Sequence, residues 1–93
     1  MRKPVIAGNW KMNKTPREAA EMIQALKPLV KDAQPTVVLC VPAVCLPEAK
    51  KAARGSKIKL GAQNVHFEAA GAYTGELSAA MLKEAGAEYV IVG

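Results

Sequence analysis

The chain has 93 residues, of which 51% are hydrophobic and 23% are charged, and its formal net charge is +5. This length and balance predict a soluble globular protein of one domain, or a piece of a larger one, and exclude two domains. No apolar run reaches the roughly 20 residues of a membrane-spanning helix, and the N-terminus lacks a long apolar signal segment. We therefore expect a cytoplasmic protein with no membrane partner.

Charge and cysteine content argue against two further classes of protein. Aromatic residues make up only 4% of the chain, so the basic residues do not predict nucleic-acid binding. Cys40 and Cys45 have neither the spacing of a zinc site nor that of a disulfide framework. We interpret both as buried thiols and expect no metal. The basic residues are dispersed except for one cluster, called the basic cluster below: Lys50, Lys51, Arg54, Lys57 and Lys59.

Four short apolar or β-branched runs predict strands at residues 4–8, 36–41, 57–62 and 89–92. The first run therefore reads as a fully buried strand, and the second and fourth are apolar almost throughout. Such runs are typical of parallel strands in a sheet that is covered on both faces.

A helix with strong start signals lies between the first two strands. Thr15 is the predicted N-cap, Pro16 takes the first helical position, and Glu18 completes a capping box. Pro28 lacks a backbone donor, so we expect a bend or an early stop there, before Lys31. Apolar residues recur three and four positions apart and predict one packing stripe: Ala19, Met22, Ile23, Leu26, Leu29 and Val30.

Two shorter helices are predicted between the later strands. The first runs over residues 47–54 and has Gly55 as its C-cap. The second begins at Ser78 and stops at Gly86. Strands that alternate with helices predict a parallel sheet, either an open doubly wound one or part of a barrel, and the spacing alone does not choose between them.

The first strand-to-helix turn disfavours dinucleotide binding. Gly8 stands alone and is followed by Asn9 and Trp10, so the turn lacks the G-x-G-x-x-G pattern.

Ligands of parallel α/β sheets gather at the carboxyl ends of the strands, which here lead into three loops, residues 9–14, 42–46 and 63–77. Lys11 and Lys14 are the basic residues of these loops, although a lysine just past a strand is usually a solvated charge. The basic cluster falls at the opposite end of the strands, where we interpret it as a solvated rim.

The third loop is long for a compact domain, and loops of this length are usually functional or disordered. It carries His66, Phe67 and Tyr73, while Gly71 and Gly75 permit tight turns, so we expect an ordered tip that docks into something. His66 has no partner at a recognisable catalytic spacing. We interpret it as a packing residue of the loop rather than as an acid or base.

Four motifs, "AGNWKMN", "GAQNV", "GAYTGE" and "YVIVG", together resemble the N-terminal part of the triosephosphate isomerase family. The resemblance is collinear over essentially the whole chain. It implies a (β/α)₈ TIM barrel, of which residues 1–93 would form a single incomplete domain with four strands and three helices. The expected fold class is therefore α/β, a partial barrel with parallel strands.

The resemblance also implies an activity. Members of this family interconvert dihydroxyacetone phosphate and glyceraldehyde 3-phosphate in glycolysis and gluconeogenesis, through an enediolate and without a cofactor. By the same resemblance, Lys11 is the cationic catalytic residue, and Asn9 and Trp10 bind the substrate with it. An ammonium group stabilises the negative charge that develops on the substrate oxygen.

The family resemblance further implies partners. Met12, Tyr73, Thr74 and Gly75 would be interface residues of a homo-oligomer. In the family, "VIVG" runs directly into an electrophilic histidine and a glutamate base comes later, so we expect residues 1–93 alone to lack turnover and to need a complementing C-terminal segment. Four strands also leave two sheet edges unpaired, which favours self-association. The alternative function is a structural, self-assembling unit without catalysis of its own.

Overall fold

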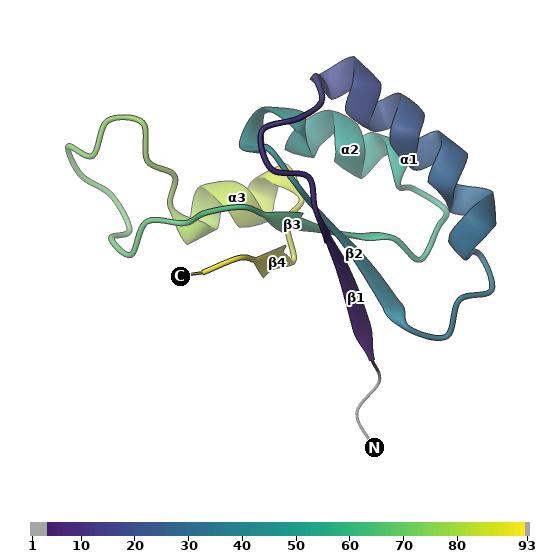
Figure 1. Cartoon of the computed structure of the whole chain (residues 1–93). Coiled ribbons are helices and arrows are strands. Elements are labelled where there is room, and N and C mark those ends of the chain that lie inside the picture. Colours follow the sequence, from purple (N-terminus) through teal and green to yellow (C-terminus); the bar gives the residue numbers. More distant parts are fainter. Residues whose placement is uncertain (1–3, 93) are drawn as a thin grey trace.

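The computed structural model describes residues 4–92. Four parallel strands form one twisted sheet in the order β1-β2-β3-β4 (Figure 1). Helices alternate with the strands along the chain. This confirms the predicted strand and helix order and the parallel sheet. The elements are β1 (Val5–Asn9), α1 (Pro16–Val30), β2 (Thr36–Val41), the 3₁₀ turn η1 (Ala43–Cys45), α2 (Leu46–Ala52), β3 (Lys59–Ala62), α3 (Ala79–Ala85) and β4 (Tyr89–Val90).

The strand register brings the carboxyl ends of the strands together. Asn9 at the end of β1 pairs with Cys40 of β2, and Ala62 at the end of β3 pairs with Val41 on one side and Val90 on the other. The loops that follow β1, β2 and β3 therefore all lie at the end of the sheet where the strands have their carboxyl termini. Two strands are shorter than predicted. Strand β3 starts at Lys59 rather than at residue 57, and β4 ends at Val90 rather than at residue 92.

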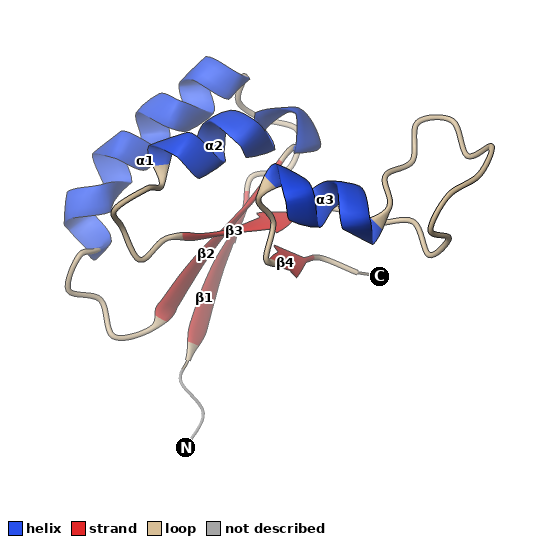
Figure 2. Ribbon diagram, turned by 180° about the vertical axis from the view of Figure 1, so that it is seen from behind, coloured by secondary structure: helices blue, strands red, loops and turns tan. Residues whose placement is uncertain are grey.

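The hydrophobic core lies between the central strands and the helices. Helices α1 and α2 contact each other and lie side by side on one side of the sheet (Figure 2). Ile23 of α1 and Leu46 of α2 are fully buried there, together with Leu60 of β3. Within residues 4–92 no helix is both long and apolar enough to cross a bilayer.

The expectation that the sheet is covered on both faces is wrong for the outer strands. Val5 and Ile6 of β1 are 54% and 58% exposed, and Tyr89 and Val90 of β4 are also exposed. By contrast, residues 38–41 of β2 are buried, because β2 has a strand on either side. Strands β1 and β4 each pair along one side only, so their apolar side chains lack part of the cover that the pattern predicted.

Helix α1 begins as predicted. The Thr15 hydroxyl accepts from the Glu18 backbone N–H at 3.3 Å, and a Glu18 carboxylate oxygen accepts from the Thr15 N–H at 2.9 Å. These hydrogen bonds lower the pKa of Glu18. Because the pKa is lower in the folded state, the stability that this carboxylate contributes is present near neutral pH and is lost as the pH falls through the lowered value.

The later part of α1 agrees only in part with the prediction. The helix continues past Pro28 but ends at Val30, before Lys31 as predicted, because a proline in the last turn removes only the one hydrogen bond that its own N–H would donate. The packing stripe is also narrower than predicted. Ala19 and Ile23 are buried, whereas Met22 and Leu29 are exposed, Leu29 to 78%.

The two short helices have different endings. Helix α2 spans Leu46–Ala52 rather than residues 47–54, and its C-cap is Ala53, so the prediction of Gly55 as the cap is wrong. Gly55 still has a φ of +76° in the turn that follows. Helix α3 is capped by the Ser78 side chain and ends at Gly86, whose φ of +119° forms the predicted left-handed cap.

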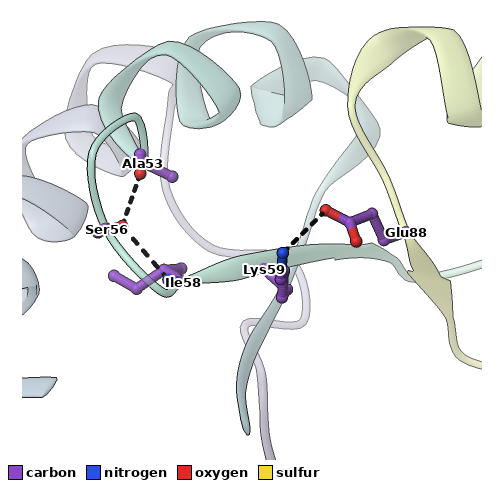
Figure 3. A network of polar contacts seen from close by, with 5 residues as sticks. All are labelled: Ala53, Ser56, Ile58, Lys59 and Glu88. Atoms are coloured by element: carbon purple, nitrogen blue, oxygen red, sulfur yellow. Dashed lines mark hydrogen bonds and ion pairs between the residues drawn. The ribbon is translucent and has the colours of Figure 1, made fainter. Parts of the chain in front are cut away.

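All five residues of the basic cluster are exposed, which agrees with a solvated rim. Lys59, the first residue of β3, lies 3.7 Å from the Glu88 carboxylate, and nearby the Ser56 hydroxyl donates to the Ala53 carbonyl at 2.6 Å and accepts from the Ile58 N–H (Figure 3). Exposed ion pairs of this kind add about 0–1 kcal/mol to stability. The cluster therefore adds little to the stability of the fold.

Candidate active site

The loop after β1 is held by the side chains of its own asparagines. The Lys11 N–H donates to Asn9 Oδ1 at 2.9 Å, and Asn13 Nδ2 donates to the Trp10 carbonyl at 2.9 Å. An asparagine that binds the backbone two residues ahead makes a compact turn without help from a helix or a strand. The loop is therefore ordered before α1 begins.

Two lysines in this loop have unusual backbone conformations. Lys11 has a φ of +54° and Lys14 a φ of +80°, and they are the non-glycine residues with positive φ in the described part of the chain. A lysine pays on the order of 1 kcal/mol for such a conformation, which persists only where surrounding bonds impose it. Strain of this kind is typical of functional loops.

Gln63, directly after β3, joins this loop to the central strands. Its Nε2 donates to the Lys11 carbonyl at 2.8 Å and to the Cys40 carbonyl at 3.0 Å. The Trp10 N–H donates to the same Cys40 carbonyl at 3.1 Å. The carboxyl ends of β1, β2 and β3 are thus tied by one side-chain amide. Sequence reasoning missed Gln63, although a polar residue at the carboxyl end of a strand, like Asn9 at the end of β1, was a usable signal.

The predicted substrate-binding residues lie together in the loop after β1 but differ in their exposure to solvent. The Lys11 side chain is exposed, and so is Asn9. Trp10 is half-buried and packs against the hydrophobic core, and with Asn9 it lines a recess of about 500 Å³ that also includes Met22 and Leu26 of α1. The roles of these residues toward a substrate stay predictions.

The long loop, residues 63–77, has neither helix nor strand, as predicted, and is closed at its base. The His66 N–H donates to the Leu77 carbonyl at 2.8 Å. The His66 ring packs against Tyr73 and Phe67, with ring centroids 4.2 Å and 4.6 Å apart. His66 Nε2 is buried and has no hydrogen-bond partner among the described residues. These contacts agree with a packing role for His66.

The tip of the long loop projects away from the sheet in both views (Figures 1 and 2). A Cβ atom at Gly71 would lie 2.6 Å from Tyr73 Cε2, and Gly71 has a φ of +141°, so the ring folds back over a position that favours glycine. Gly75 has a φ of +88° in the turn that the Glu76 N–H closes on the Tyr73 carbonyl at 3.0 Å. Tyr73, Thr74 and Gly75 are exposed at this tip.

The two cysteines are buried, as predicted. Burial raises the pKa of both thiols, and the Glu18 charge raises the pKa of Cys45 further. The Cys45 thiol donates to the Lys14 carbonyl at 3.4 Å and so helps to hold the end of the loop. Thiols held in the protonated form are poor nucleophiles. Among residues 4–92 no group of three or more His, Cys, Asp or Glu side chains could hold a metal ion.

Comparison with known proteins places the chain in a family. The sequence model described as "Triosephosphate isomerase" matches residues 4–93. The chain belongs to the triosephosphate isomerase family. Triosephosphate isomerase from Clostridium botulinum (strain Loch Maree / Type A3) is 60% identical over 93 residues, and the enzyme of that name from Acetivibrio thermocellus is 60% identical over 92 residues.

The fold agrees with this assignment. The crystal structure of triosephosphate isomerase from Bartonella henselae superposes with a TM-score of 0.91 at 46% identity and covers 99% of this chain. The four strands and their helices therefore form part of a TIM barrel. The chain spans 38% of that structure and 38% of the Clostridium botulinum relative, and it corresponds to the N-terminal region of the family.

Proposed function

We propose that this chain supplies the first part of a triosephosphate isomerase active site, in which Lys11 and Asn9 act on the substrate. The reaction moves a proton between adjacent carbons of a triose phosphate and interconverts dihydroxyacetone phosphate and glyceraldehyde 3-phosphate. The observation that carries the proposal is the loop after β1, where the peptide N–H and C=O of Lys11 are both bound by side chains. Membership in the family supplies the reaction class.

In this proposal the Lys11 ammonium group stabilises the negative charge that develops on the substrate oxygen as the carbon loses its proton. Asn9 turns the loop with its Oδ1 and leaves its amide nitrogen available for the substrate. Trp10 holds the loop to the core from its half-buried position. No residue of this chain is assigned the base, which the family resemblance places in a later part of the barrel.

The experiment that tests this proposal compares two proteins. Residues 1–93 by themselves should show no isomerase turnover, because no base lies near the substrate carbon. A chimera in which this chain replaces the matching 93 residues of the Clostridium botulinum enzyme should interconvert the two triose phosphates. We call this protein the chimera below. A folded chimera without turnover would contradict the proposal, as would turnover by residues 1–93 alone.

We further propose that the tip of the long loop binds a neighbouring subunit in a homo-oligomer. Tyr73 of the tip packs against the His66 ring near the base of the loop, and the tip extends away from the sheet, so it is available to a partner. Met12, at 95% exposure, offers an apolar contact in the loop that carries Lys11. In this arrangement Thr74 and Gly75 of one subunit approach the Met12 loop of the other.

A second candidate function, a self-assembling structural unit, is supported by the apolar residues exposed on β1 and β4, such as Ile6 and Val90. For residues 1–93 on their own, covering this surface favours association. Light scattering at micromolar concentration should therefore give a mass above the 9.8 kDa of one chain. The Ile6→Lys variant should shift the mass toward a monomer, whereas Leu29→Lys, a charge at an exposed site on α1, should not. A well-ordered monomer would remove this candidate.

A further inference from the structure

Gln63 makes contacts that the reaction assigned above does not explain. It follows Ala62, the last residue of β3, and its Nε2 lies within hydrogen-bonding distance of two backbone carbonyls, those of Lys11 at 2.8 Å and Cys40 at 3.0 Å. A primary amide has two N–H groups, and here each has a carbonyl acceptor. Because both neighbours are acceptors, the nitrogen and not the oxygen of the amide must face them.

The hydrogen bond from Gln63 to the Lys11 carbonyl means that both backbone polar groups of Lys11 are bound by side chains. Asn9 Oδ1 accepts from the Lys11 N–H at 2.9 Å, and Gln63 donates to the Lys11 carbonyl, so side chains bind this residue on both sides. Lys11 has a φ of +54°, a conformation that a lysine leaves readily unless surrounding bonds hold it. The second bond of Gln63 anchors this clamp to β2, whose last four residues are buried.

We propose that Gln63 is a positioning residue for Lys11. It holds the Lys11 peptide in its positive-φ conformation and so fixes where the lysine side chain leaves the loop. Gln63 itself touches no reacting atom in this account. The inference rests on the proposed role of Lys11, since a clamp matters to catalysis only if the clamped residue acts on the substrate.

The chemistry of the clamp predicts which replacements fail. Methionine at position 63 keeps the length of the side chain but donates no hydrogen bond, so both carbonyls lose this partner. Glutamate at position 63 would place a carboxylate, which only accepts hydrogen bonds, against the two carbonyl oxygens. The loop can then relax from its strained conformation, and a displacement of about 1 Å at a reacting group can cost about a hundredfold in rate.

The test is a double-mutant cycle in the chimera. Gln63→Met alone should lower kcat/KM by about tenfold to a hundredfold. In a chimera that already carries Lys11→Met, adding Gln63→Met should lower kcat/KM by less than about twofold, because the residue that Gln63 positions is gone. Gln24→Met is the matched control, since the Gln24 amide also donates to a backbone carbonyl, that of Ala52, far from the site. It should leave kcat/KM unchanged.

The outcomes separate this inference from the proposed function. Equal losses from Gln63→Met with and without Lys11 would mean a general structural role and would overturn the inference. Wild-type kcat/KM in the Gln63→Met chimera would also overturn it, while the role of Lys11 would stand. If Lys11→Met itself had no effect, the proposed function would fail, and the positioning role with it.

Discussion

Replacing Lys11 with methionine should lower kcat/KM of the chimera by about a thousandfold. At a separation of about 4 Å and an effective dielectric constant near 20, an ammonium group attracts a developing oxyanion by on the order of 4 kcal/mol. If this attraction acts only in the transition state, it corresponds to about three decades of rate. Methionine keeps an unbranched side chain of similar length but removes the charge. Steady-state assays in both directions measure the effect.

Lys14→Met is the matched control for this result. Lys14 belongs to the same loop, also has a positive φ, and is exposed, so its replacement makes the same chemical change in the same kind of backbone. It should alter kcat/KM by less than about threefold, because Lys14 has no proposed role toward the substrate, and salt and solvent screen its exposed charge. Equal losses from the two variants would mean that the loop acts through its general positive charge and not through Lys11.

Replacing Ile23 with alanine should destabilise residues 1–93 by about 2–5 kcal/mol, the usual cost of a cavity at a fully buried aliphatic side chain. Ile23 is 0% exposed and belongs to the core between α1 and the sheet. Because small domains have only about 5–15 kcal/mol of stability, this loss is a large part of the total. Urea unfolding followed by far-UV circular dichroism measures it, with the midpoint falling and the slope unchanged.

Leu29→Ala provides the comparison on the same helix. Leu29 is 78% exposed although the apolar pattern of α1 predicts it in the packing stripe. Its truncation should change the free energy of unfolding by less than about 0.5 kcal/mol. Equal losses of stability in the two variants would mean that Leu29 also packs in the core, which contradicts its exposure on α1.

Features that depend on neighbours in the sequence could be predicted from the sequence. The capping box of Thr15 and Glu18 and the left-handed cap at Gly86 each depend on residues within one turn of helix, and both form as expected. The four motifs sufficed to indicate the family because they lie in the strand ends and loops.

Features that depend on distant partners could not be predicted. The exposure of Val5 and Ile6 depends on which strands and helices lie beside β1. An apolar run in the sequence does not indicate these neighbours. The role of Gln63 depends on carbonyls 52 and 23 residues away in the sequence, and a backbone acceptor has no residue type by which a pattern could find it. For the same reason, the positive φ of Lys11 becomes visible only in the structure.

The central claim is that the loop after β1 holds the Lys11 ammonium group where negative charge develops on the substrate. A crystal structure of the chimera with a phosphorylated hydroxy carboxylate, whose carboxylate imitates the enediolate oxygens, tests it most directly. We expect Lys11 Nζ within about 3 Å of a carboxylate oxygen, with Asn9 beside it. A bound analogue with Lys11 Nζ directed into solvent, beyond hydrogen-bonding distance of the analogue, would contradict the account.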